Sequence, residues 1–260
     1  MSGLARELAV AVAAAEEAGE ILLGHYRARE RLTVASKRAG DFVSEADLAA
    51  EAHLRGRLLG AWPGDGWLGE ETAAAAGGRR WVVDPLDGTT NFLRGLPHWC
   101  LSIGLEVAGR PVLGVVHDPL RAETFAAAPG SGVTLNGRIV GPAGTGAMRD
   151  ALFGTGIPFG GMAHIDAHAA DIARLMPHCA GVRRMGAAAL DLAYVAAGRL
   201  DGFWERRLQL WDIGAGLALM AAAGVRVEGW TPDEDPWTTG TVVAAVPVLF
   251  DAFAGVLRDG

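Results

Sequence analysis

Apolar residues recur three or four positions apart in several stretches of the chain, and this spacing predicts amphipathic helices. In the first stretch, Leu4, Leu8 and Val12 fall on one helical face. In the second, Ser44 is a helix-capping residue, and Asp47 three positions later completes a capping box. The predicted helices cover residues 4–27, 44–59, 164–176, 187–198 and 212–223.

Shorter runs rich in β-branched and aromatic residues, bounded by Gly and Pro, predict strands. The strand over residues 80–84 is expected to end at Asp84, because Pro85 opens a Pro-Leu-Asp-Gly turn. Further strands are expected at 98–107, 112–118 and 124–128, and the short connections between them favour antiparallel pairing. Because helices alternate with strands, the sequence indicates an α/β protein in which helices cover sheets.

Composition narrows the class of protein. The 260 residues are half apolar and 20% charged, which suits a globular chain with a sizeable core and either one large domain or two lobes. The net charge of −7 argues against affinity for nucleic acid or anionic membranes. The longest apolar run falls short of the ~20 residues of a membrane helix. Cys100 and Cys179 are too few for a disulfide framework and are expected to be reduced thiols of a cytoplasmic protein.

The segment from Asp84 to Thr90, Asp-Pro-Leu-Asp-Gly-Thr-Thr, carries the clearest chemical signal. Asp84 ends a strand and Asp87 adds a second carboxylate three residues later, while Gly88 permits close approach of the backbone. Two carboxylates facing backbone N–H groups suit a hard cation beside a phosphate. A Pro-Leu-Asp-Gly turn with an Asp helix cap is the alternative explanation of this segment taken alone.

Three other acidic residues stand in suitable places, and each also has a structural explanation. Glu70 lies in a loop about 14 residues before Asp84, where one extra carboxylate is unremarkable. Asp47 is the third residue of its capping box, and Asp212 opens a helix after Trp211. Taken together with Asp84 and Asp87, they favour a carboxylate site for cations.

These residues, in this order, resemble the signature blocks of the inositol monophosphatase family, a superfamily of magnesium-dependent, lithium-sensitive phosphatases. The blocks are Asp41–Asp47, Gly69–Glu71, Asp84–Phe92 and Trp211–Asp212, and the similarity extends over about residues 5–225. Within that family, the resemblance is to bacterial inositol-1-monophosphatases. The resemblance implies a layered α-β-α-β-α sandwich of the sugar-phosphatase type, with residues 1–260 as one catalytic domain in which two lobes split near 140–150 are possible. It also implies a homodimer.

The resemblance implies two or three Mg²⁺ ions. The first would be held by Glu70, Asp84 and the carbonyl of Leu86, and the second by Asp84, Asp87 and Asp212. These ligands are all oxygen atoms, as Mg²⁺ prefers.

The remaining catalytic roles follow from the same resemblance. Glu70 and Asp47 would reach a weakly bound further ion. Asp47 and Thr89 would orient and deprotonate a metal-activated water, which attacks in line with the ester. The backbone N–H groups of Gly88 and Thr89 would receive the phosphate oxygens.

Substrate contacts are implied at several further positions. Asp87, Asp212 and Glu205 would face the substrate, although a solvated surface position beside Arg206 explains Glu205 equally well. Arg183 or its neighbour Arg184 would contact the substrate or cross a dimer interface, and Ala188 would contribute its backbone. Ala187 stands where many relatives have Ser or Thr, a departure that bears on the substrate and not on hydrolysis.

The expected activity is therefore hydrolysis of a small polyol phosphate, with myo-inositol monophosphate as the first candidate. Histidinol phosphate, other sugar phosphates and nucleotide phosphates are the alternatives within the superfamily. A regulatory binding protein that retains a phosphatase site is the alternative from another class of function.

Overall fold

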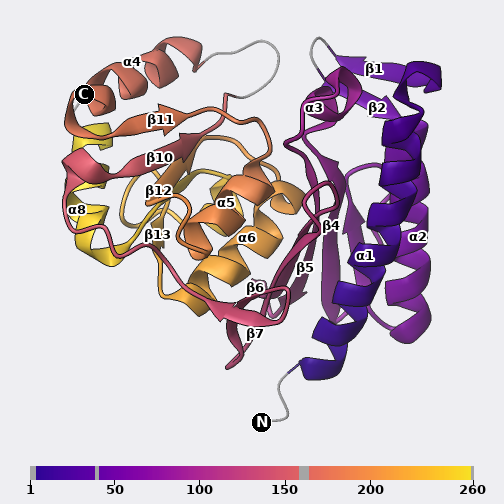
Figure 1. The fold of residues 1–260 in the computed structure, drawn as a ribbon. Helices are drawn as coiled ribbons and strands as arrows, with labels where there is room; N and C mark the ends of the chain where they lie inside the picture. The colour runs from indigo at the N-terminus through magenta and orange to yellow at the C-terminus, as the bar shows by residue number, and fades with distance from the viewer. Residues whose placement is uncertain (1–3, 39–40, 158–163, 259–260) are drawn as a thin grey trace.

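Three layers of helices alternate with two β-sheets (Figure 1). The computed structural model describes residues 4–38, 41–157 and 164–258. Helices α1 (Ala5–Arg27) and α2 (Glu45–Ala61) form the first layer, α5 (Ala188–Ala196) and α6 (Leu210–Ala223) the central layer, and α4 (Ile165–Leu175) and α8 (Pro247–Arg258) the third. The predicted α-β-α-β-α sandwich is confirmed, and all five predicted helices are present.

The first sheet lies between the α1/α2 layer and the α5/α6 layer (Figure 1). Its order follows the chain, and every pair is antiparallel except β3 with β4, so the predicted antiparallel meander is confirmed. The strands are β3 (Gly66–Gly69), β4 (Arg79–Asp87), β5 (Cys100–Val107), β6 (Arg110–Asp118), β7 (Glu123–Ala128), β8 (Gly132–Leu135) and β9 (Arg138–Val140).

The second sheet has a mixed pattern that the sequence did not predict. Its order is β11-β10-β12-β14-β13, with β10 parallel to both neighbours and β14 antiparallel to both of its own. The strands are β10 (Leu152–Thr155), β11 (Gly181–Arg183), β12 (Gly202–Glu205), β13 (Arg226–Glu228) and β14 (Val242–Ala245). Outside the two large sheets and their layers lie the paired strands β1 (Val34–Arg38) and β2 (Asp41–Ser44), the short helices α3 (Thr89–Arg94) and α7 (Pro236–Thr239) and, in the described part of the chain, three single-turn 3-10 helices.

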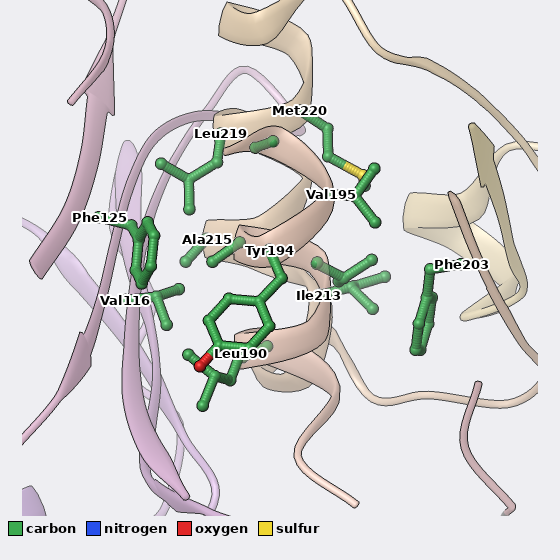
Figure 2. Close-up of a cluster of buried hydrophobic side chains, with 14 of the residues drawn as sticks. Val116, Phe125, Leu190, Tyr194, Val195, Phe203, Ile213, Ala215, Leu219 and Met220 are labelled. Atoms are coloured by element: carbon green, nitrogen blue, oxygen red, sulfur yellow. The ribbon is translucent and has the colours of Figure 1, made fainter. Parts of the chain in front are cut away.

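The central helices are largely apolar, apart from Asp191 and Asp212 in their first turns, because both of their faces pack against a sheet. Figure 2 shows the cluster: Val116 and Phe125 reach α5 and α6 from the first sheet, and Phe203 reaches them from the second. Tyr194 of α5 packs edge-on against Phe125, with ring centroids 5.9 Å apart. This core joins the two sheets through one pair of helices.

Strand β4 is longer than predicted. It continues through Pro85 to Asp87, and Asp87 pairs with Cys100 of β5 after a register shift. Proline is tolerated in a strand where the ladder is interrupted, because no N–H donor is needed there. The sharp change of direction therefore comes at Gly88, three residues beyond the predicted point.

Both cysteines are free, with Cys100 buried and Cys179 half-buried. Among the described residues, no helix combines the length and the apolar character that crossing a membrane requires.

Helix α6 lies directly on the first sheet because two strands carry glycine beneath it. A Cβ on Gly114 of β6 would lie 2.9 Å from the backbone carbonyl carbon of Ala215, and one on Gly104 of β5 would lie 3.1 Å from the carbonyl carbon of Gly214. Both contacts are with the helix backbone, which cannot rotate away from an added methyl group as a side chain can. The closeness of α6 to the sheet therefore depends on these two positions.

We predict that Gly114→Ala destabilises the protein by about 3 kcal/mol, because the added methyl group overpacks the helix–sheet contact. Gly56→Ala is the control: Gly56 lies within α2 with open space around it, so alanine should stabilise the helix by about 0.5–1 kcal/mol. Urea denaturation of both variants measures the two changes. Equal stability of Gly114→Ala and the unmodified chain would contradict the close packing.

Candidate active site

The turn between β4 and α3 presents two carboxylates side by side. The Asp84 side chain is 2% exposed, and its Oδ1 accepts a hydrogen bond from the Leu86 N–H at 2.9 Å. Gly88 has a φ of 89°, in the region that favours glycine, and a Cβ there would lie 3.3 Å from the Cβ of Ala187. The turn thus closes against the start of α5 with both carboxylates held near its tip.

Asp47 has both of the roles that the sequence offered for it. Its Oδ2 accepts hydrogen bonds from the Ser44 N–H at 2.9 Å and the Ser44 hydroxyl at 2.6 Å, which makes the predicted capping box of α2. Its Oδ1 accepts a longer hydrogen bond, 3.4 Å, from the Thr89 hydroxyl. Burial, opposed by the Ser44 hydrogen bonds, raises the pKa of Asp47 to about 6.

Four predicted metal ligands influence one another electrostatically. Burial raises the pKa of Asp84 well above its ordinary value, and the charges of Glu70, Asp87 and Asp212 raise it further. These four residues come from β4, from the loop after β3 and from the first turn of α6. The fold therefore gathers at one place carboxylates that lie far apart in the sequence.

Asp87 is fixed by the helix on the far side of the turn. Its Oδ2 accepts a hydrogen bond from the Ala189 N–H at 2.7 Å, and the Cys100 thiol lies 3.8 Å from the same oxygen. Burial raises the pKa of Asp87 to about 7, although the Ala189 N–H lowers it. The first turn of α5 thus orients a predicted metal ligand.

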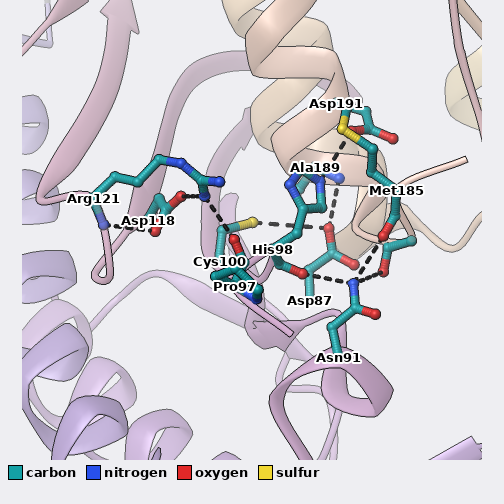
Figure 3. Close-up of polar contacts among 11 residues, drawn as sticks. Asp87, Asn91, Pro97, His98, Cys100, Asp118, Arg121, Met185, Ala189 and Asp191 are labelled. Carbon is teal, nitrogen blue, oxygen red and sulfur yellow. Dashed lines mark hydrogen bonds and ion pairs between the residues drawn. The ribbon is translucent and has the colours of Figure 1, made fainter. Parts of the chain in front are cut away.

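A polar network to which the sequence analysis gave no role holds α3 against α5 (Figure 3). The Asn91 amide donates to the His98 carbonyl at 2.7 Å and to the Met185 carbonyl at 2.8 Å. The His98 ring lies 3.1 Å from the buried carboxylate of Asp191. His98 is seven residues from Asn91 along the chain, but Met185 is 94 residues away, so local sequence patterns could not have shown this contact.

Glu205 is buried, so the solvated-surface explanation of this residue is wrong. It ends β12 and is 7% exposed. Burial raises its pKa well above the ordinary value, and the charges of Asp212, Asp191 and Asp87 raise it further. Glu205, at the end of a strand of the second sheet, is therefore close enough to feel carboxylates from α6, α5 and β4.

The two candidate arginines differ in position. Arg183 is exposed on the edge strand β11, and its guanidinium donates to the Val182 carbonyl at 3.2 Å. The charge of Arg184 lowers the pKa of both Glu205 and Asp191, so Arg184 is the member of the pair linked to the site. Ala188 is half-buried at the first position of α5, next to the residue whose N–H holds Asp87.

The donor set fits a hard divalent cation. All its side chains offer oxygen, and burial together with neighbouring carboxylates raises the pKa of both Asp84 and Asp87, an environment that a cation would relieve. Across residues 4–38, 41–157 and 164–258, no three His, Cys, Asp or Glu side chains form a group able to hold a metal by themselves. A cation here would complete its shell with carbonyl, phosphate and water oxygens, which is the usual habit of Mg²⁺.

Comparisons with known proteins identify the family of the chain. A sequence model described as the inositol monophosphatase family matches residues 4–259. The chain is 43% identical to the inositol-1-monophosphatase of Rhizobium meliloti (strain 1021), covering 96% of each chain, and 38% identical to the Nus factor SuhB of Escherichia coli (strain K12), covering 97% of this chain and 96% of that one. The crystal structure of the extragenic suppressor protein suhB from Bartonella henselae superposes with a TM-score of 0.95 at 37% identity, covering 98% of this chain and all of that one.

The family is generally dependent on metal ions, in keeping with the oxygen-donor site. Its inositol-1-monophosphatase members are phosphoric monoester hydrolases, and this chain is an enzyme of that class. By its matching family model and its relatives, the chain belongs to the inositol monophosphatase family.

Proposed function

We propose that this enzyme is a Mg²⁺-dependent phosphomonoesterase that hydrolyses a small polyol phosphate, with myo-inositol monophosphate as the preferred substrate. The observation that carries the proposal is the buried Asp84, on which the charges of Glu70, Asp87 and Asp212 converge. Such a site repels a phosphate unless cations intervene, so it suits metal-assisted phosphate chemistry. The 43% identity to an inositol-1-monophosphatase supports the choice of substrate.

Under this proposal Glu70, Asp84 and the Leu86 carbonyl hold one ion, and Asp84, Asp87 and Asp212 hold a second. The Leu86 carbonyl already accepts the Thr89 hydroxyl at 3.0 Å, which brings it beside the predicted catalytic residues. Bound Mg²⁺ would supply Lewis acidity and lower the pKa of its coordinated water. A third, weaker ion would contact Glu70 and Asp47.

The Thr89 hydroxyl and Asp47 are the proposed proton acceptors for the attacking water. Thr89 stands within hydrogen-bond distance of Asp47, so its proton has a carboxylate to which it can pass. A pKa of about 6 leaves Asp47 mostly ionised at neutral pH, yet basic enough to accept that proton. The N–H groups of Gly88 and Thr89 are the proposed donors to the phosphate.

On the opposite side of the site, Glu205 and Asp212 are the proposed acceptors for substrate hydroxyls. The backbone of Ala188 is proposed to contact the substrate beside them. Arg183 is retained as a proposed contact to substrate or to a second subunit. Its exposure on an edge strand suits the second of these roles.

The proposal also covers domain organisation, cellular location and oligomeric state. Similar relatives match over 92% or more of their own length, which supports a single catalytic domain. Two free cysteines suit the cytoplasm. The family resemblance supports a homodimer.

A regulatory function is the second candidate, and the observation that favours it is the 38% identity to proteins named Nus factor SuhB. The two functions do not exclude each other, because a binding surface need not overlap the carboxylate site.

We expect Mg²⁺-dependent release of phosphate from inositol 1-phosphate in preference to histidinol phosphate, fructose 1,6-bisphosphate and adenosine 3′,5′-bisphosphate. A colorimetric phosphate assay with Mg²⁺ or with chelator measures it. If chelator left the release of phosphate unchanged, the proposed metal dependence would be excluded. If the enzyme preferred another of these esters, that ester would take the place of myo-inositol monophosphate as the proposed substrate. A protein that binds Mg²⁺ but hydrolyses none of these esters would favour the regulatory function.

Thr89→Val should lower kcat by about 10²–10⁴-fold with little change in KM, because it removes the hydroxyl that faces Asp47 and keeps the shape of the side chain. Thr90→Val is the matched control in the same helical turn, and we expect its kcat to stay within about twofold of the unmodified enzyme. Steady-state kinetics on the preferred ester measure both. Equal kcat for the two variants would remove Thr89 from the mechanism.

Asp87→Asn should raise the Tm of the metal-free protein at about pH 8 and reduce the increase in Tm that Mg²⁺ produces. Because the folded-state pKa of about 7 is raised, the stability contributed by the neutral carboxyl is complete below about pH 4 and is lost as the pH rises through 7. Asparagine stays neutral across this range. Thermal denaturation with chelator or Mg²⁺ measures the shift.

Asp166→Asn, in the exposed first turn of α4, is the matched control for Asp87→Asn and should behave as the unmodified chain does. If Mg²⁺ stabilised Asp87→Asn as strongly as the unmodified protein, Asp87 would not be a metal ligand.

A further inference from the structure

The Glu205 backbone is fixed on both sides of the residue. Strands β10 and β12 run side by side and parallel (Figure 1), and Thr155 is in register with Trp204. The buried Thr155 hydroxyl donates to the Trp204 carbonyl at 2.7 Å, immediately before Glu205. The end of β12 is therefore tied to the end of β10.

The residue after Glu205 is held by a different element. The Arg206 guanidinium forms an ion pair with Asp171, which is fully buried in α4, and lies 3.4 Å from the centre of the Trp230 ring. A buried carboxylate and an aromatic face together restrict this arginine to one position. With the backbone held before and after it, Glu205 has only its own side-chain torsions left to set the position of its carboxylate.

Gly156, the residue that directly follows the end of β10, lies beside that carboxylate. A Cβ built on Gly156 would lie well inside van der Waals distance of all three carboxylate atoms of Glu205, Cδ, Oε1 and Oε2. The carboxylate therefore occupies the space that any side chain at this position would fill. The clash is with the end of a movable side chain, so a substitution at 156 displaces the carboxylate and leaves the backbone in place.

We propose that Gly156 is a specificity-determining residue: the absence of a side chain there places the Glu205 carboxylate where it accepts hydrogen bonds from hydroxyl groups of the substrate's alcohol portion. This inference rests on the proposed function and adds the residue that positions its acceptor. The three atoms nearest to a Cβ at position 156 all belong to the Glu205 carboxylate, so Gly156 acts through Glu205. Its effect is therefore on the choice of ester, and the hydrolytic chemistry lies elsewhere.

The test compares two esters. Inositol 1-phosphate carries hydroxyls for Glu205 to accept, and phenyl phosphate carries none. Gly156→Ala should lower the ratio of kcat/KM for inositol 1-phosphate to that for phenyl phosphate by about tenfold, the effect of losing one hydrogen bond to the substrate. Gly154→Ala, two residues earlier and within β10, is the matched control: its Cβ would lie 2.8 Å from the end of the Leu200 side chain and 3.2 Å from the Phe203 ring, and the ratio should stay within about twofold.

A double variant separates positioning from general damage to the strand. Glu205→Ala alone should lower the ratio by at least as much as Gly156→Ala. Adding Gly156→Ala to Glu205→Ala should then change nothing further, because the carboxylate that the methyl group displaces is already gone. Additive losses in the double variant, or an unchanged ratio in Gly156→Ala, would overturn the inference.

Failure of the proposed function gives a different result. An unmodified enzyme without any Mg²⁺-dependent hydrolysis of either ester would contradict the proposed function and this inference with it. Hydrolysis of phenyl phosphate with no preference for inositol 1-phosphate would contradict the inference that Glu205 accepts hydrogen bonds from substrate hydroxyls. It would leave the proposed phosphatase function in place.

Discussion

Carboxylates buried beside one another repel, and each also loses the water that would stabilise its charge. In this enzyme both effects meet at Asp84, whose neighbours Glu70, Asp87 and Asp212 all carry carboxylates. The arrangement persists because backbone N–H groups hold it: Leu86 holds Asp84 and Ala189 holds Asp87. A site that concentrates negative charge in this way is suited to divalent cations, whose binding offsets the repulsion.

The packing of the central helices α5 and α6 positions two of these carboxylates, Asp87 and Asp212. Gly104 and Gly114 let α6 lie directly on the first sheet, and Asp212 stands in the first turn of that helix. Helix α5 approaches from the same layer, and its first turn holds Asp87. The apolar contacts that hold α5 and α6 between the two sheets therefore also position the first turns of these helices, where the polar groups of the site lie.

The two sheets contribute different parts of the candidate site. The first supplies Asp84 and Asp87, and the adjoining helices supply Asp47 and Asp212, all near the point where phosphate chemistry is proposed. The second supplies Glu205, which rests beside Gly156 at the ends of β12 and β10. Such a division allows the substrate preference to change through the second sheet while the hydrolytic residues stay the same. That separation is consistent with a family in which similar chains are named for different functions, inositol-1-monophosphatase in one case and Nus factor in another.

Local signals in the sequence determined five of the helices, the antiparallel meander, the Ser44–Asp47 capping box and the pair of carboxylates around Pro85, because each depends on residues a few positions apart. The C-terminal helix α8 was not predicted. The extension of β4 to Asp87 was missed, since the pairing with Cys100 of β5 is set by the sheet and not by the turn residues. Only the tertiary structure decided that Glu205 is buried, that Asn91 bridges α3 to the segment before α5, and that Gly156 leaves room for a carboxylate. These contacts join residues separated by tens of positions, and their geometry is fixed by how helices pack between sheets, which local sequence patterns do not specify.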